Sequence, residues 1–244
     1  MRAALFAAFP QEITEIIRNL KGVQRPKRHP FSLFLGEYSS NEIIVVLAGM
    51  GSGNTEAALE CILKEYKPDL VLSSGFGGAL YDGAVIGEIV WGSKVILIRD
   101  GIAETIELSR IRDIFCRLPA NFTVHEGNIL TLERWMKKSE IKKILLQEFS
   151  FPVCDMETFF LAKLSMKRGV PFIAFRSITD RADEEIPPEF LHVTDESGRY
   201  RLSRALRMIF SKPKLIPNII RTGKNSVIAS NTLWRFVKTL IEVT

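Results

Sequence analysis

Short apolar runs alternate with longer amphipathic segments along most of the chain. The apolar runs are expected to be buried strands, and they cover residues 2–8, 31–35, 43–47, 70–74, 89–98, 153–155 and 170–177. Segments whose apolar positions recur every three or four residues are expected to be helices, and they cover residues 12–20, 55–66, 133–148, 158–167 and 226–243. Strands that alternate with helices in this way indicate an α/β fold.

The pattern changes after the Pro187-Pro188 pair, and we place a boundary near Ser197. Three residues that disfavour helices interrupt the segment that follows: Pro213, Pro217 and Gly223. One apolar stripe along the expected final helix consists of Val227, Trp234, Val237 and Ile241. We therefore expect a main domain at residues 1–197 and a helical C-terminal extension at residues 198–244, packed on or beside it.

The formal net charge of +5 is distributed unevenly over the 244 residues. Residues 197–244 hold ten Lys and Arg and a single acid, Glu242, so this part carries +9 and the rest of the chain −4. Such asymmetry indicates an anionic partner for one part of the surface. The composition of 46% hydrophobic and 25% charged residues is ordinary for a folded domain and excludes a disordered chain.

The sequence has neither a membrane span nor a metal-binding motif. It contains no run of about 18 apolar residues without charge, and its N-terminal apolar stretch is too short for a signal peptide, so we expect a cytoplasmic protein. The cysteines and histidines are few and scattered: Cys61, Cys116, Cys154, His29, His125 and His192. We therefore expect no disulfide framework and no metal site.

The glycine-rich sequence G-M-G-S-G at positions 49–53 lies between an expected strand and an expected helix. Glycines permit close approach of a ligand, and free N–H groups at a helix start favour an anion, here at Gly51 and Ser52. A dinucleotide-binding oxidoreductase is one alternative, but Asn54 breaks its G-x-G-x-x-G fingerprint, and Asp69 precedes its strand instead of following it. A tight turn without a ligand is another.

A second glycine-rich sequence, S-S-G-F-G-G at positions 73–78, follows another buried strand, and Asp180 follows a third. In open α/β sheets, ligands bind outside the carboxyl ends of the strands. We therefore expect these segments to converge on one ligand site, although convergence alone does not name the reaction.

The order and spacing of several motifs resemble the nucleoside phosphorylase and methylthioadenosine/S-adenosylhomocysteine nucleosidase superfamily. The motifs are A-G-M-G at 48–51, K-P-D-L-V at 67–71, S-G-F-G-G at 74–78, D-M-E-T at 155–158, G-V-P-F at 169–172 and R-S-I-T-D at 176–180. The combination of Met156-Glu157 with Arg176 and Asp180 is fairly specific, whereas either half alone is weak. The resemblance implies a three-layer α/β/α fold around a central mixed twisted sheet.

From residue 180 onward the sequence is similar to the hopanoid-associated phosphorylase subfamily. The matching pieces are D-R-A-D at 180–183, I-P-P at 186–188, G-R at 198–199, R-A-L-R at 204–207, Pro213 and Pro217. The usual small nucleosidases end sooner after the catalytic strand. This resemblance implies adenosylhopane, a nucleoside joined to a hopanoid lipid, as the substrate in hopanoid biosynthesis. A methylthioadenosine/S-adenosylhomocysteine nucleosidase or another purine nucleoside phosphorylase is the alternative.

The superfamily resemblance implies an enzyme that breaks the N-glycosidic bond of a purine nucleoside. Asp180 matches the acid that protonates N7 of the base, and helix capping is its alternative role. Glu157 matches the carboxylate that binds the ribose hydroxyls, and Met156 matches the residue packed against the sugar. The other expected substrate-binding residues are Asp155, Ser74, Gly75 and Phe76.

Two further residues bear on the nucleophile, which is water in nucleosidases and phosphate in phosphorylases. Glu12 falls where the nucleosidases keep the glutamate that activates water, and a carboxylate favoured by the helix dipole is the alternative. Arg176 matches a position that orients water or holds phosphate, and an ion pair with an acid such as Asp155 is the alternative. The choice between hydrolysis and phosphorolysis stays open.

The chain also departs from the nucleosidase pattern. Phe76 replaces the usual Ser, and residues 100–124 do not match the nucleosidase substrate strand, so the group on the 5′ side of the ribose is open. The phosphate-site arginine of bacterial purine phosphorylases is not recognisable. The resemblance further implies a homodimer without a cofactor, in which phosphate is a co-substrate if water is not the nucleophile.

The basic C-terminal region supports an alternative of another class, a non-catalytic protein that binds a membrane surface. The apolar residues expected at such an interface are Trp234, Phe236, Leu240 and Ile241. Either this protein or an enzyme acting on a lipid-linked substrate would associate peripherally with the inner membrane surface. A helical cap with its basic face in water is the simpler alternative. We expect no nucleic acid, because no recognition motif accompanies the basic residues.

Overall fold

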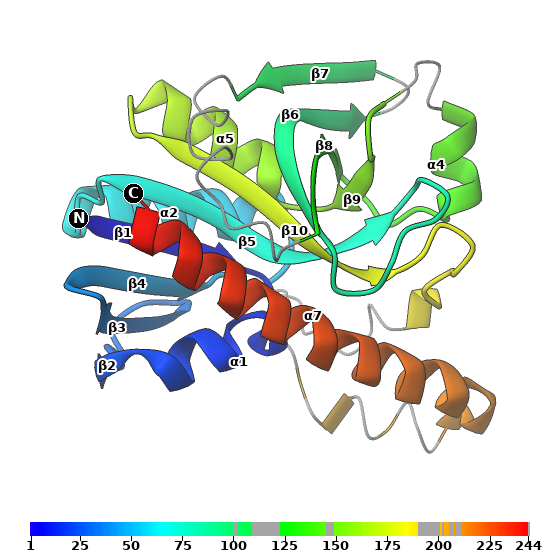
Figure 1. Cartoon of the computed structure of the whole chain (residues 1–244), viewed down its shortest axis with the longest axis horizontal. Coiled ribbons are helices and arrows are strands. Elements are labelled where there is room, and N and C mark those ends of the chain that lie inside the picture. Colours follow the sequence, from blue (N-terminus) through cyan, green and yellow to red (C-terminus); the bar gives the residue numbers. More distant parts are fainter. Residues whose placement is uncertain are drawn as a thin grey trace.

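The computed structural model describes residues 1–99, 102–108, 123–144, 149–189 and 211–243, together with Arg201, Ser203, Arg204 and Arg207. In these residues a mixed sheet of ten strands has helices on both faces (Figure 1). The strands are β1 (Arg2–Ala7), β2 (Lys21–Gln24), β3 (Ser32–Tyr38), β4 (Asn41–Leu47), β5 (Leu70–Ala79), β6 (Ile89–Arg99), β7 (Ile102–Glu107), β8 (Val124–Leu132), β9 (Val153–Asp155) and β10 (Phe172–Asp180). The helices are α1 (Pro10–Asn19), α2 (Ser52–Glu65), α4 (Lys138–Ile144), α5 (Thr158–Lys167) and α7 (Ile216–Val243), preceded by a 3-10 turn at Pro213–Leu215.

Four neighbouring strands, β4, β1, β5 and β10, run parallel to one another. Their carboxyl ends therefore meet at one edge of the sheet, which is where ligands bind in open α/β folds. Helix α1 packs against α7, and α2 packs against α5. The α/β prediction and the mixed sheet are confirmed.

Part of the sheet closes on itself, which the sequence pattern does not predict. Strand β10 pairs with both β5 and β6, and the path continues from β6 through β8 and β9 back to β5. Strand β5 contributes to this ring until Ala79, so Gly75, Gly77 and Gly78 continue the strand beyond Ser74, where the apolar run ends. Closure leaves β5 and β10 with neighbours on both sides near the point where they end.

Helix α7 is longer than the sequence predicts. It begins at Ile216, and Pro217 is tolerated because it occupies the first turn, where its missing N–H costs nothing. Gly223 lies inside the helix without breaking it. The buried face of its second half belongs to the same hydrophobic core as the sheet, through Leu233, Phe236, Val237, Leu240 and Ile241.

Two predictions about the C-terminal region are therefore wrong. Phe236 and Leu240 are fully buried and Ile241 is 3% exposed, so these side chains do not face a membrane. Val227, predicted on the apolar stripe, is 63% exposed. The predicted domain boundary between residues 197 and 198 lies outside the described residues.

The remaining element predictions differ mainly at their ends. The helix predicted at 133–148 is shorter, since α4 begins at Lys138, and residues 145–148 lie outside the described part. Strands β2, β7 and β8 are not predicted by the apolar pattern. Among the described helices, none combines the length and the apolar character needed to cross a membrane.

Candidate active site

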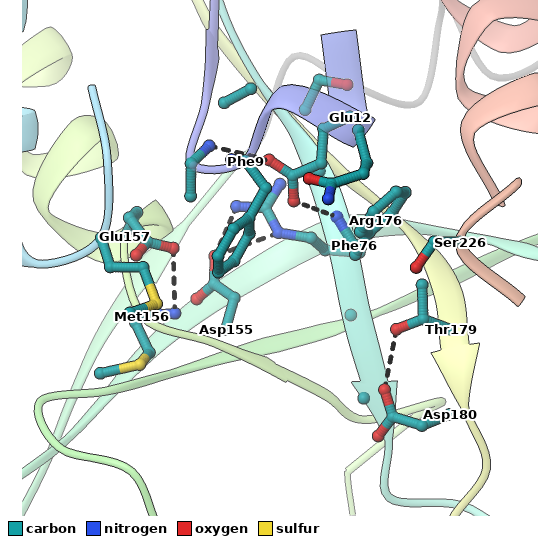
Figure 2. Close-up of a pocket in the computed structure, with 18 of the residues that line it drawn as sticks. Phe9, Glu12, Phe76, Asp155, Met156, Glu157, Arg176, Thr179, Asp180 and Ser226 are labelled. Atoms are coloured by element: carbon teal, nitrogen blue, oxygen red, sulfur yellow. Dashed lines mark hydrogen bonds and ion pairs between the residues drawn. The ribbon is translucent and has the colours of Figure 1, made fainter. Parts of the chain in front are cut away.

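A cavity of about 800 Å³ lies at the carboxyl ends of the parallel strands. Its size is within the range typical of small-molecule sites. Nine of the predicted site residues line it: Glu12, Ser74, Gly75, Phe76, Asp155, Met156, Glu157, Arg176 and Asp180. They come from α1, from β5, from β9 and the residues after it, and from β10, so the convergence that the sequence predicts is confirmed (Figure 2).

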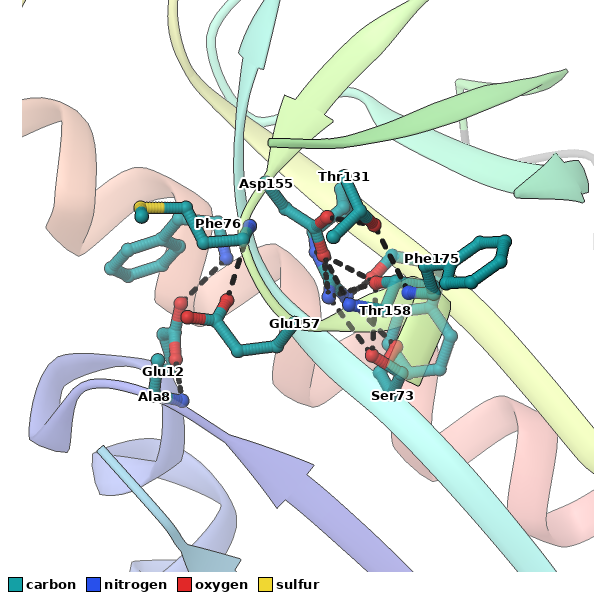
Figure 3. Close-up of polar contacts among 12 residues, drawn as sticks. Ala8, Glu12, Ser73, Phe76, Thr131, Asp155, Glu157, Thr158 and Phe175 are labelled. Carbon is teal, nitrogen blue, oxygen red and sulfur yellow. Dashed lines mark hydrogen bonds and ion pairs between the residues drawn. The ribbon is translucent and has the colours of Figure 1, made fainter. Parts of the chain in front are cut away.

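Glu12 lies in the first turn of α1, and its carboxylate reaches back toward the end of β1. Oε2 accepts the backbone N–H groups of Ala8 (2.8 Å) and Phe9 (2.9 Å), and Oε1 accepts that of Phe76 (2.8 Å), as Figure 3 shows for Ala8 and Phe76. A carboxylate has about four acceptor positions, so one position is left for a ligand. Glu12 is only 4% exposed.

Burial raises the pKa of Glu12 above its ordinary value of 4.5. The three backbone N–H groups and the charge of Arg176 oppose that increase, because they favour the ionised carboxylate. Glu12 is thus a carboxylate held in one orientation at the cavity wall, with the properties of a general base.

Two glycines of β5 make room for carboxylates. A Cβ atom on Gly75 would lie 2.7 Å from Oε1 of Glu12, and one on Gly78 would lie 2.8 Å from Oδ2 of Asp180. Any residue other than glycine at position 75 or 78 would place its Cβ atom there and displace the carboxylate. The glycine-rich sequence at 73–78 therefore has a steric reason at two of its positions.

Arg176 lines the cavity, is 3% exposed, and binds protein atoms with all of its N–H groups. Nε donates to Oδ2 of Asp155 (3.1 Å), and Nη1 donates to the backbone oxygens of Ser73 (2.9 Å) and Phe175 (2.8 Å). Nη2 donates to Oγ of Ser73 (2.9 Å) and to the side chains of Asp155 and Thr158. The ion-pair alternative for Arg176 is confirmed, and no N–H group is left to hold phosphate.

Asp155 is engaged by the same network. Oδ1 accepts the hydroxyl of Thr131 (2.7 Å), and Oδ2 accepts the backbone N–H of Thr158 (3.1 Å) as well as Arg176. The Asp155 side chain is 3% exposed. Protein groups therefore bind both of its oxygens, and Asp155 supports the loop that carries the next two residues.

Glu157 lines the cavity beside Met156, and Figure 2 draws both on one side of Arg176. Its Oε1 accepts the backbone N–H of Gly51 (3.2 Å), and Oε2 accepts that of Met156 (3.3 Å). The Gly51 amide, predicted to bind an external anion, thus binds the carboxylate of Glu157. Neither Gly51 nor Ser52 is among the described residues that line the cavity.

Burial raises the pKa of Glu157, and the nearby negative charge of Asp155 adds to the increase. Two acceptor positions remain on the carboxylate after its two backbone contacts. They suit a vicinal diol, such as the 2′- and 3′-hydroxyls of a ribose.

Asp180 ends β10 and lies away from Glu157, beside Thr179 (Figure 2). Its Oδ1 accepts the hydroxyl of Thr179 (2.8 Å), and Oδ2 forms an ion pair with Lys138. Burial raises the pKa of Asp180, and the charge of Lys138 opposes that increase. A buried carboxyl group on the cavity wall is suited to general-acid catalysis.

Four residues of the site are not predicted from the sequence: Lys138, Ser73, Thr131 and Thr158. The last three bind the Arg176–Asp155 pair from separate elements, and the sequence has no periodicity that relates them. Lys138 follows another lysine at the start of a charged helical segment. The sequence there is typical of a helix face exposed to water. Only the fold brings these residues to the site.

His29, Cys61 and Glu65 have donor atoms that all lie within 4.8 Å of one another. The Cys61 thiol lies 3.5 Å from Nδ1 of His29 and donates to Glu65 (3.3 Å), while Arg28 binds the other oxygen of Glu65 (2.6 Å). Hydrogen bonds and one ion pair account for this group, which does not line the cavity. We assign it no metal.

Known proteins resemble the chain in sequence and in fold. The sequence is 23% identical over 229 residues to the 5′-methylthioadenosine/S-adenosylhomocysteine nucleosidase of Buchnera aphidicola subsp. Acyrthosiphon pisum, which covers 86% of this chain and 97% of that protein. It is 24% identical over 221 residues to the nucleosidase of the same name from Shewanella loihica, covering 82% and 95%.

Solved structures show the same fold. The Neisseria meningitidis 5′-methylthioadenosine/S-adenosylhomocysteine nucleosidase in complex with methylthio-immucillin-A superimposes with a TM-score of 0.73 at 17% identity, covering 100% of this chain and 99% of the other. Futalosine hydrolase of Helicobacter pylori gives a TM-score of 0.73 at 18% identity, with 99% and 97% covered.

A family model of the phosphorylase superfamily matches residues 2–211, a range that includes every residue of the cavity described above except those of α7. The match spans most of the chain. The chain therefore belongs to the phosphorylase superfamily.

Proposed function

We propose that the protein cleaves the N-glycosidic bond of a purine nucleoside. The observation that carries this proposal is the placement of three buried or partly buried carboxyl groups, Glu12, Glu157 and Asp180, around one cavity. Asp180 protonates N7 of the base, Glu157 binds the ribose hydroxyls, and Glu12 activates the nucleophile. These roles divide the reaction among a leaving group, an oxocarbenium-like sugar and an attacking atom.

The names of the relatives support this chemistry. The curated relatives are nucleosidases that act on methylthioadenosine and S-adenosylhomocysteine, and a structural neighbour is a futalosine hydrolase. All three substrates named there are nucleosides, which supports a small-molecule nucleoside as the partner of this cavity.

The site favours water over phosphate as the nucleophile. The cations among the described residues that line the cavity are Arg18, Lys138 and Arg176. Each is paired with a carboxylate: Arg18 with Glu15 (2.6 Å), and the other two with Asp180 and Asp155. Lys138 and Arg176 are buried in these pairs, whereas Arg18 is 68% exposed. A phosphate ion would therefore meet the negative charge of Glu12 with no buried, unpaired cation beside it, whereas a water molecule can transfer its proton to Glu12. We propose hydrolysis, with no cofactor.

A lipid-linked nucleoside such as adenosylhopane is the finer proposal for the substrate. The cavity reaches α7, whose Ile219, Gly223 and Val227 line it. The outer surface of the same helix exposes Ile220 and Ile228, at 53% and 49%. Lys212, Lys214, Arg221 and Lys224 lie along the same segment. Apolar side chains beside basic ones suit an anionic membrane surface, where each basic residue contributes about 1 kcal/mol.

Co-sedimentation with anionic vesicles tests the membrane part of this proposal. The double variant Ile220→Ser with Ile228→Ser should bind vesicles less than the native chain does, and Val85→Ser, an exposed apolar residue outside α7, should leave binding unchanged. Equal sedimentation of all three proteins at low salt would reject the membrane part alone.

The homodimer stays a prediction, which analytical ultracentrifugation tests.

The activity is tested by measuring free base released from adenosine, inosine, methylthioadenosine, S-adenosylhomocysteine and adenosylhopane, each with and without phosphate. Base release that does not depend on phosphate supports hydrolysis. Release that requires phosphate would replace hydrolysis by phosphorolysis. No base from any substrate would reject the proposed function.

A further inference from the structure

Lys138, the first residue of α4, is buried against the end of β10. It is 5% exposed, and Asp180 beside it is 6% exposed. The Nζ atom forms an ion pair with the Asp180 carboxylate and donates to the backbone oxygens of Asp180 (3.1 Å) and Arg181 (2.5 Å). An ammonium group has three N–H bonds, so these acceptors use all of them.

The local structure holds Lys138 in this position. The backbone N–H groups of Lys138 and Ser139 donate to the carboxylate of Glu185 (3.1 and 3.3 Å), which fixes the start of α4 to the segment after β10. On the other side, Gly78 leaves the necessary space, because a Cβ atom there would lie 3.1 Å from Cε of Lys138. The contact is therefore built from three separate elements.

The other groups that face Asp180 do not supply a second cation. Thr179 donates its hydroxyl, the partly buried Cys154 thiol lies nearby, and the charge of Glu184 raises the pKa of Asp180. Glu184 is itself paired with Arg181 (3.4 Å) and Arg221 (3.7 Å). Among the described residues, Lys138 is the one that forms an ion pair with Asp180.

A buried carboxylate without a counter-ion is strongly disfavoured. When Asp180 transfers its proton, its O–H bond breaks, an N–H bond forms at N7, and the electrons of the glycosidic bond move to the base. Asp180 is left as a carboxylate. The ammonium group of Lys138 stabilises that product state more than the protonated state, because only the carboxylate carries charge. Lys138 thus makes Asp180 a stronger acid.

We propose that Lys138 is a positioning residue that fixes the orientation and the charge state of Asp180, since its N–H bonds all go to protein atoms. This inference rests on the proposed role of Asp180 in nucleoside cleavage. It assigns a function to a lysine that the sequence places on an ordinary surface helix.

Two effects in opposite directions follow for Lys138→Met. The general acid must be protonated, so activity is lost as the pH rises through the pKa of Asp180. Because Lys138 lowers that pKa, its removal should move the alkaline limb of the kcat profile upward by about 1 to 3 pH units. The same change makes Asp180 a weaker acid, so kcat at the acidic plateau should fall by about tenfold or more.

The experiment measures kcat against pH for the native protein and for Lys138→Met, Lys138→Arg and Lys142→Met. Lys138→Arg keeps the charge and should restore the limb to its native position. Lys142, on the exposed side of the same helix with a single long contact to Asp82 (3.8 Å), is the matched control and should leave the profile unchanged. If the alkaline limb of Lys138→Met stays at the native pH while kcat falls, Lys138 has only a packing role and the inference is overturned.

A second measurement does not depend on turnover. The carboxyl band of protonated Asp180 in infrared difference spectra, with Asp180→Asn as the blank, should persist to higher pH in Lys138→Met than in the native protein. If this shift occurs while the native protein releases no base, the inference holds and the proposed function fails. If the native protein releases base and neither the band nor the limb moves, the inference fails alone. Should Lys138→Met not fold, Lys138→Gln replaces it in both measurements.

Discussion

Arg176 and Asp155 form an ion pair in the wall of the cavity, and their side chains are only 4% and 3% exposed. Hydroxyl groups of Thr131 and Thr158 satisfy the same carboxylate. Because both partners bind protein atoms, the pair supports the site without reacting in it.

Replacement of Arg176 by methionine should therefore lower the free energy of unfolding. It would leave the Asp155 charge buried without a partner, which costs about 3 to 5 kcal/mol. Urea denaturation measures the loss, and Arg168→Met is the control. Arg168 pairs with Glu60 on the surface, where both side chains are about half exposed, so its removal should cost about 1 kcal/mol or less. Equal losses in the two variants would show that the buried pair has no special role.

Gly75→Ala should reduce activity with little effect on folding. The new Cβ atom would lie 2.7 Å from Oε1 of Glu12 and displace the carboxylate from the attacking water. We expect kcat to fall about 100-fold, as for loss of a general base. Gly53→Ala is the matched control, since a Cβ atom there meets no neighbour within 4 Å. Native activity in Gly75→Ala would contradict the role assigned to Glu12.

Glu157→Gln should stabilise the protein in a manner that depends on pH. Burial raises the pKa of Glu157 above its ordinary value of 4.5, so the folded state holds the proton more tightly than the unfolded state. Stability is then greatest below pH 4.5 and is lost as the pH rises toward the folded pKa, by about 1.4 kcal/mol for each unit of difference. The variant removes this loss.

Thermal unfolding at pH 4 and pH 8 measures the effect of Glu157→Gln. Tm should change little at pH 4 and rise at pH 8, while the KM for nucleosides increases because one hydroxyl acceptor is lost. A Tm that falls at pH 8 would contradict the assigned pKa shift.

Phe236→Ala should destabilise the protein by about 3 to 5 kcal/mol, because the ring is fully buried in the main core. Val227→Ala on the same helix should change stability by about 0.5 kcal/mol or less, since that side chain is 63% exposed. Similar small values for both would indicate that α7 is only loosely attached to the domain.

The sequence predicts the site better than it predicts the sheet. Asp180 and the glycine-rich sequence at 73–78 follow apolar runs, and the carboxyl ends of parallel strands must meet at one edge, so their convergence follows from the pattern. Glu12 and Glu157 are site candidates only through the family resemblance, and β9, which precedes Glu157, runs antiparallel to β5. The ring formed by β5, β6, β8, β9 and β10 depends on pairings between distant segments, which apolar periodicity does not contain.

Two residues show why the sequence does not predict every contact of the site. Arg176 is polar and lies in a motif, so the sequence suggests contact with the nucleophile, but its actual partners come from four other positions in the fold. Gly223 suggests the end of a helix, but packing of the second half of α7 into the core outweighs a local preference of about 1 kcal/mol.

The most direct test of the account compares release of free base from methylthioadenosine by the native protein, Asp180→Asn and Asp183→Asn. Asp183 lies three residues further along the chain, and its side chain is 76% exposed. Asparagine at position 180 cannot donate a proton as an acid does, so we expect turnover to fall by about 100-fold or more, while Asp183→Asn stays at the native rate. Equal turnover by native protein and Asp180→Asn, or no base release by the native protein from this or any other purine nucleoside, would contradict the account.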